Sequence, residues 1–332
     1  MLSTLIILTF YLLLCAKNTD FVPTDFTLDK TNLLKAILPF GIILHHISFN
    51  ASQSVLYDFR FTGPYIVGLF FFMSGYGLEC QYRKGKISFR ALPAKLKKLF
   101  IPFIIPVICY LFLAIVVEKE TVHNILKGVF LDGQILLPHT WFISVLVAIY
   151  ICYFSTRQLI KDNKIHLLIL FILFTSFAIM IKTSNNSHIY TSNYAFLIGM
   201  VVQQNEKQWI IWASKWYVYV SAFILFTFIS FSYIENRPIF KGAGIIGVPL
   251  YVCTFILLIT KIPAHYSTKI TRFFCMISYE MYLFQGISIL LIYHFNIIPL
   301  WQSVVCILTL NILLSFISHK VIIYSSTLCH KR

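Results

Sequence analysis

Two basic side chains in one apolar stretch have the residue types and the spacing for chemistry inside a membrane. Lys35 and His46 lie eleven positions apart, which on an α-helix returns to within about 20° of the same face and spans about 16 Å along the axis. Ionisable groups in membrane segments cost about 2.5–3.5 kcal/mol each, so each is a functional-site hypothesis. A neutral imidazole can take a proton from a hydroxyl or form a covalent intermediate, and a lysine at the mouth of a channel can hold an anion. The alternatives are a structural histidine between helices and a lysine that extends to the lipid headgroups.

A loop rich in positive charge follows the next apolar stretch. It carries seven Lys and Arg within residues 83–98 and leads into Pro102. Such a loop attracts anionic lipid headgroups or the phosphates of a soluble cofactor. In the apolar stretch before it, Ser74 and Gly75 are small residues of the kind that let membrane helices pack closely. The seven basic residues are Arg83, Lys84, Lys86, Arg90, Lys95, Lys97 and Lys98.

Membrane helices are the elements that must position these residues. Of the 332 residues, 58% are hydrophobic and only 12% are charged, whereas soluble domains carry about 25% charged residues. The mean hydropathy of +0.80 also exceeds what one soluble core could cover. With spans of roughly 17 to 25 residues, we expect an all-α, polytopic membrane helix bundle of ten core helices plus one N-terminal helix. The eleven expected segments are residues 2–16, 33–49, 64–80, 99–117, 140–154, 165–182, 191–203, 211–232, 244–261, 273–293 and 299–319.

The same segments divide the chain into three parts. Residues 1–27 are expected to form an anchor helix and a connecting loop, because residues 2–16 lack the basic start and the small-residue cleavage site of a removed leader. Residues 28–324 form one transmembrane domain, and residues 325–332 form a short basic tail.

The distribution of Lys and Arg predicts the orientation, because cytoplasmic loops carry an excess of both. With eleven spans and an external N-terminus, 21 of the 27 Lys and Arg fall on the inside. The basic loops and the C-terminus are therefore expected in the cytoplasm. The net charge of +15 then reflects orientation and contact with membrane lipids, and it requires no nucleic-acid partner. The six basic residues outside are Arg60, Lys119, Lys127, Lys182, Arg237 and Lys241.

The eight cysteines are scattered singly in or beside apolar segments. They have no paired spacing typical of disulfides or zinc sites. We interpret them as small core residues and expect no metal.

Taken together and in order, the motifs resemble the acyltransferase-3 family of bacterial membrane O-acyltransferases over about residues 28–320. The first core helix of that family carries an Arg, ten residues and a His, and Lys35 and His46 occupy these positions. Its next helix carries Phe-Phe-x-x-Ser-Gly, which residues 71–75 match, followed by a basic loop that leads to a proline. Weaker matches are Trp141-Phe142, residues 196–199 and residues 277–283.

Two positions depart from the family pattern. Lys35 keeps the charge of the usual Arg but loses its forked geometry for phosphate. Gln285 stands where many relatives place a His.

The resemblance implies an enzyme of the bacterial cytoplasmic (inner) membrane. It would move an acyl group, in the first place acetyl, from cytoplasmic acetyl-CoA or another acyl-CoA to a hydroxyl of an extracytoplasmic glycan or lipid-linked sugar. His46 would act as general base or carry the acyl group, and both possibilities stay open. For the residues said to line the acceptor site, helix packing, interfacial anchoring or a buried hydrogen bond is the alternative. The implied donor-site residues are Lys35, Arg83, Lys95 and Lys98, and the implied acceptor-site residues are Ser74, Trp141 and Glu280.

Two other classes of membrane protein remain as alternatives. A glycan flippase or secondary transporter could use Lys35 and His46 as a substrate or proton pathway, but such carriers often contain internal repeats, and the sequence has none. A glycan polymerase would be expected to use Arg in a large external loop. The longest external loop expected here, residues 118–139, contains no Arg.

Overall fold

The computed structural model describes residues 26, 28–49, 51, 55–116, 121, 137, 139–182, 191–234, 244–260, 268–294 and 299–330. All secondary-structure elements within these residues are helices, which confirms the all-α prediction. The first five are α2 (Leu28–Ser48), α3 (Gly63–Arg83), α4 (Leu92–Val116), α6 (Trp141–Leu159) and α7 (Asn163–Lys182), with short 3₁₀ segments η1 (Val55–Phe61) and η2 (Phe89–Ala91). The others are α9 (Tyr194–Gln204), α10 (Glu206–Ala213), α11 (Trp216–Ile234), α12 (Gly244–Ile259), α13 (Lys269–His294) and α14 (Leu300–His330).

Each expected segment from residue 33 onward coincides with one of these helices, and residues 2–16 lie outside the described part. Several helix boundaries differ from the sequence prediction, and two of the differences affect whole segments. The segment expected at residues 211–232 includes the end of α10 and most of α11, which meet at a sharp bend of 86°. α14 continues to His330, through most of the segment expected as a tail.

Five described helices are long and apolar enough to cross a membrane, and the bent α10–α11 pair would make a sixth. Their outer faces carry large apolar side chains, such as Ile108 and Phe112 on α4 and Phe171 on α7. A helix that is apolar all round is typical of a membrane span. The five are Phe89–Val116, Trp141–Leu159, Asn163–Met180, Lys269–His294 and Leu300–Ser325.

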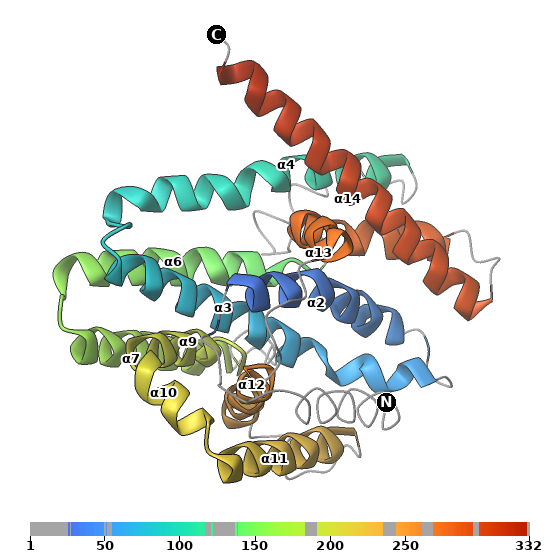
Figure 1. Ribbon diagram of the computed structural model, residues 1–332. Helices are drawn as coiled ribbons and strands as arrows, with labels where there is room; N and C mark the ends of the chain where they lie inside the picture. Colours follow the sequence, from blue (N-terminus) through green and yellow to red (C-terminus); the bar gives the residue numbers. More distant parts are fainter. Residues whose placement is uncertain are drawn as a thin grey trace.

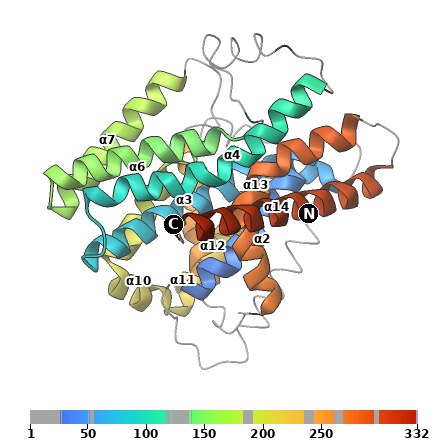
Figure 2. The ribbon, with the colours of Figure 1, turned by 90° about the horizontal axis from the view of Figure 1, so that it is seen from above.

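The helices with the polar candidates lie in the middle of the bundle. In Figure 1, α2 and α3 occupy the centre, with α4 and α14 on one side and α10, α11 and α12 on the other. Figure 2 shows α4 and α6 running side by side, and the two helices are in contact. α13 packs against both α2 and α14. α2 also packs against α3, and α3 packs against α9 and α12.

Two glycines allow α3 and α9 to approach closely. A Cβ at Gly75 would lie 2.1 Å from the carbonyl oxygen of Phe196, and one at Gly199 would lie 2.2 Å from that of Phe72. Any larger residue would force the backbones apart. The resemblance drew attention to both glycines, and the contact between their helices explains why small residues are needed there.

Candidate active site at the histidine cluster

His46 lies in the last turn of α2 and faces another imidazole. Its ring stacks on that of His139, with 3.8 Å between ring centroids and 28° between planes. The Nδ1 atom of His46 is buried and has no hydrogen-bond partner among the described residues. In the tautomer in which it carries no hydrogen, such a nitrogen can accept a proton or attack a carbonyl carbon. The arrangement therefore suits acid–base or covalent chemistry.

His45 has a different environment, because consecutive residues of an α-helix point about 100° apart. Its Nδ1 donates to the carbonyl of Phe59 at 3.1 Å, and its ring covers Gly63, where a Cβ would lie 2.5 Å from Nε2. The ring centroids of His45 and His46 are 4.7 Å apart. His45 thus joins α2 to η1 and α3 while closing one side of the cluster.

His139 is the site residue that sequence reasoning missed. It directly precedes Thr140, the N-cap of α6, and its backbone is left-handed, with φ of 65°, which costs about 1–2 kcal/mol. Its carbonyl accepts a hydrogen bond from the Tyr282 hydroxyl at 2.7 Å. Although part of the side chain is exposed, burial of the remainder lowers the pKa of His139 below its ordinary 6.5. No spacing rule links His139 to His46, and the only sequence signal was a histidine beside the Trp141-Phe142 motif.

The predicted donor residues gather at the opposite end of α2, which we call the basic end and define by Lys35, Lys95 and Lys98. Lys95 lies within electrostatic range of both Lys35 and Lys98. Its Nζ donates to the side-chain oxygen of Gln81 at 2.8 Å. Arg83 is instead held by the end of α9, where it donates to the carbonyl of Gln203 at 2.8 Å. The structure thus brings together three of the four predicted donor residues.

Polar side chains occupy the region between the basic end and the histidines. Ser74 forms a hydrogen bond with Tyr150 of α6. Tyr279 of α13 interacts electrostatically with Tyr150, and its hydroxyl donates to the carbonyl of Leu99 at 2.9 Å. One turn further along α13, Tyr282 reaches His139. Sequence reasoning singled out Ser74 but none of these tyrosines, although the spacing of Tyr279 and Tyr282 places them on one helix face.

The other two predicted acceptor-site residues lie differently. Glu280 faces α14, where its Oε1 accepts a hydrogen bond from Nδ1 of His319 at 2.7 Å. This places the carboxylate in a contact between helices. Trp141 is half-buried at the start of α6 and packs against the main hydrophobic core. It is two residues from His139 in the chain, so its predicted role at the acceptor site stays a prediction.

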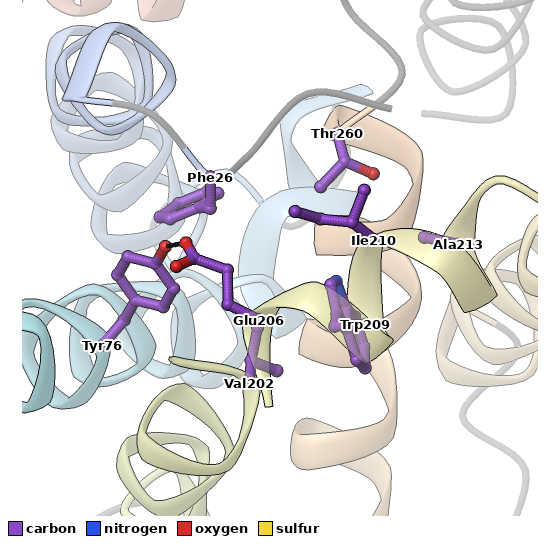
Figure 3. Close-up of a pocket in the computed structure, with 8 residues that line it drawn as sticks. All are labelled: Phe26, Tyr76, Val202, Glu206, Trp209, Ile210, Ala213 and Thr260. Atoms are coloured by element: carbon purple, nitrogen blue, oxygen red, sulfur yellow. Dashed lines mark hydrogen bonds between the residues drawn. The ribbon is translucent and has the colours of Figure 1, made fainter. Parts of the chain in front are cut away.

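A small cavity at the far side of the bundle has no connection with this site. Figure 3 shows Glu206 pointing toward Tyr76, whose hydroxyl donates to it, with Phe26 and Trp209 beside them. The cavity measures about 10 Å³, enough for about one water molecule. It cannot hold an acyl donor.

Three histidines, His45, His46 and His139, lie close together. Within the described ranges, no group of three His, Cys, Asp or Glu side chains is arranged to hold a metal ion.

Nearly the whole chain is similar to a known protein family. A family model described as an acyltransferase domain matches residues 28–320, nearly the whole chain. No curated protein and no solved structure matches the chain. The matched range contains the stacked histidines, the tyrosines between the two ends and the three lysines of the basic end. The chain therefore belongs to the acyltransferase-3 family and is a multi-pass membrane acyltransferase.

Proposed function

We propose that this protein transfers an acyl group, in the first place acetyl, from cytoplasmic acyl-CoA to a hydroxyl of an extracytoplasmic glycan or lipid-linked sugar. The observation that carries the proposal is the buried Nδ1 of His46, which has no hydrogen-bond partner in the described part of the chain, at the other end of α2 from Lys35. The membrane would be the bacterial cytoplasmic membrane, with the basic end toward the cytoplasm. No metal takes part in the proposed reaction.

The two ends of α2 would have different roles in the reaction. Lys35, Lys95 and Lys98 would hold the phosphates of the donor, because clustered cations attract phosphate. The acyl arm would then extend along the side chains of Ser74, Tyr150 and Tyr279 toward His46. An acceptor hydroxyl would approach from the opposite side of the membrane, so donor and acceptor would meet at the histidines.

Two reaction courses are compatible with a free imidazole nitrogen. As a general base, His46 would remove the hydroxyl proton while the oxygen attacks the thioester carbonyl. The new C–O ester bond forms, the C–S bond breaks, and the thiolate of CoA takes the proton back from the imidazolium. As an acyl carrier, the ring nitrogen would attack the thioester first, and the C–S bond would break as the thiolate takes the proton of the other ring nitrogen, which gives CoA and an acyl-imidazole. The acceptor oxygen would then attack the acyl carbon, the C–N bond would break, and the hydroxyl proton would return to the imidazole.

His46→Ala tests the proposal. Purified protein or membranes containing it are supplied with labelled acetyl-CoA and a surface glycan, and transferred label is measured. We expect transfer to fall by about 10² to 10⁴, the usual contribution of a positioned acid or base, with unchanged abundance and thermal unfolding. Undiminished transfer in the variant would remove His46 from the mechanism, and movement of unmodified glycan without any acyl transfer would favour a carrier.

The donor part of the proposal is tested at Lys35. Lys35→Ala should weaken acetyl-CoA binding by about tenfold, since one charge-assisted contact with a phosphate is lost. Lys35→Arg keeps the charge and should bind within about threefold of the parent, measured by isothermal titration. Equal loss in both variants would mean that position 35 is structural.

A further inference from the structure

A cavity of about 440 Å³ lies beside the basic end, between the end of α3, η2 and the end of α6. Its size is that of a small-molecule site. Aromatic side chains and cations make up much of its wall, and none of its lining residues is Asp or Glu. The aromatic and cationic lining residues on which the proposal depends are Tyr82, Phe89, Arg90, Phe154, Arg157 and Lys161.

Arg157 is fixed at this wall by a buried ion pair. Its Nη2 lies 2.6 Å from Oε1 of Glu79, with side chains 3% and 0% exposed. Glu79 also accepts hydrogen bonds from the Tyr153 hydroxyl at 3.0 Å and from the Gln204 amide at 3.1 Å. With three donors, the carboxylate is well satisfied. Neither Glu79 nor Arg157 was a candidate site residue from the sequence.

The ion pair with Glu79 engages only part of the Arg157 guanidinium. Its Nε and Nη1 atoms are buried and have no hydrogen-bond partner among the described residues, a situation that costs about 1–3 kcal/mol per group if it stays unmet. The guanidinium lies over the Tyr82 ring, 4.3 Å from its centroid, which fixes its plane. A fixed guanidinium with free N–H groups matches the oxygens of a phosphate.

Two further cations lie at the rim. Arg90 and Lys161 are both exposed lining residues. The nearest acidic neighbour in the chain, Asp162, accepts hydrogen bonds from the backbone of Lys164 and Ile165 at the start of α7. The rim charges can therefore add to the attraction that Arg157 exerts on an anion.

We propose that this cavity binds the adenine nucleotide end of acyl-CoA, with phosphates on Arg157, Arg90 and Lys161 and the base against Tyr82, Phe89 or Phe154. The proposal rests on the function proposed above. It assigns the nucleotide end of the donor to the cavity rather than to the three lysines of the basic end. Gln81 precedes Tyr82 and binds Lys95, so a donor anchored in the cavity can extend past the basic end. An anionic phospholipid offers a phosphate but no planar base for the aromatic wall.

The first experiment measures binding of adenosine 3′,5′-bisphosphate and of CoA to the purified full-length protein by isothermal titration. Arg90→Gln combined with Lys161→Gln should weaken both ligands by about tenfold or more. The matched control is Lys84→Gln with Lys164→Gln, which removes two exposed charges of the same end outside the cavity lining. It should change binding less than threefold. Equal weakening by both pairs, or no weakening by the first, would overturn the proposal.

Arg157→Lys provides a second readout within the cavity. A lysine keeps a cation beside Glu79 but lacks the two free N–H groups, so bisphosphate binding should fall by about tenfold while thermal unfolding stays close to the parent. Unchanged binding in this folded variant contradicts the assignment.

The experiments distinguish a wrong assignment of the cavity from a wrong proposed function. If Lys35→Ala weakens CoA binding while the Arg90/Lys161 variant binds normally, the donor function stands and the cavity is wrong. If the parent protein binds neither CoA nor bisphosphate, the donor function itself fails. Repeating the titration in nanodiscs with and without phosphatidylglycerol tests whether the cavity is a lipid site. The nucleotide assignment is overturned if bisphosphate binds to the parent protein in neither kind of disc and if phosphatidylglycerol is retained by the parent protein but not by the Arg90/Lys161 variant.

Discussion

At the scale of single residues, the site depends on the contact between His46 and His139, which come from distant parts of the chain. The left-handed backbone of His139 and the hydrogen bond from Tyr282 to its carbonyl together hold its ring against His46. Strained backbone persists only where the surroundings over-determine it, and such positions cluster at functional sites. We therefore regard His139 as a positioning residue for His46.

His139→Asn removes the imidazole ring but keeps the backbone conformation, because Asn tolerates the left-handed region. We expect acetyl transfer to fall by about tenfold or more, with thermal unfolding close to that of the parent. Loss of stability in step with loss of activity would indicate a purely structural role.

The pH dependence of transfer gives an independent check of His139. Because burial lowers its pKa below 6.5, its ring is neutral at pH 7 and gains a proton only below its ordinary range. A charge there would face His45 and His46, the titratable rings in contact with it or beside it, and would disfavour protonation of His46 by its substrate. Transfer should therefore decline toward acid pH, and this decline should shift in His139→Asn. Superimposable pH profiles would exclude the coupling.

At the scale of elements, close packing of α3 and α9 sets the positions of Ser74 and Glu79. Ser74 adjoins Gly75, the glycine that contacts the Phe196 carbonyl, and Gln204 at the end of α9 binds Glu79. One helix pair thus positions Ser74, which lies on the proposed path of the acyl arm, and the carboxylate that holds Arg157.

Gly75→Ala should disrupt this helix pair, and Gly77→Ala is its matched control. The Cβ at position 75 meets backbone at 2.1 Å, whereas one at position 77 meets nothing within 4 Å. We expect Gly75→Ala to lower the free energy of unfolding by about 1–3 kcal/mol and Gly77→Ala to be tolerated. Thermal unfolding in detergent distinguishes them, and equal melting temperatures would show that α3 and α9 separate without cost.

At the scale of the whole molecule, the bundle has two chemically different ends. Cations collect at the starts of α2 and α4 and the ends of α3 and α6, whereas the histidine cluster lies at the end of α2 and the start of α6. A donor from one side and an acceptor from the other fit this polarity. Which end faces the cytoplasm is a prediction from the basic loops.

Single cysteines test this orientation. Lys84→Cys, between α3 and η2, should react with an impermeant thiol reagent only from the cytoplasmic side, and Ser187→Cys, in the segment between α7 and α9, only from outside. The parent protein, with its native cysteines, provides the background. Reversed labelling would overturn the orientation and the direction of transfer.

The sequence by itself determined the features that depend on local periodicity and composition. Apolar runs of sufficient length predicted the helices, because a bilayer requires backbone hydrogen bonds to be satisfied within each segment. The spacing of Lys35 and His46 predicted opposite ends of one helix, because the rise per residue is constant. The matches to the acyltransferase-3 motifs were likewise local.

Only the tertiary structure decided which side chains meet. The ring of His139 stacks on that of His46, Arg157 forms an ion pair with Glu79, and Glu280 contacts His319. These contacts link helices far apart in the sequence. They depend on how the helices pack and cross, and a periodic pattern within one helix carries no information about the helix it will face.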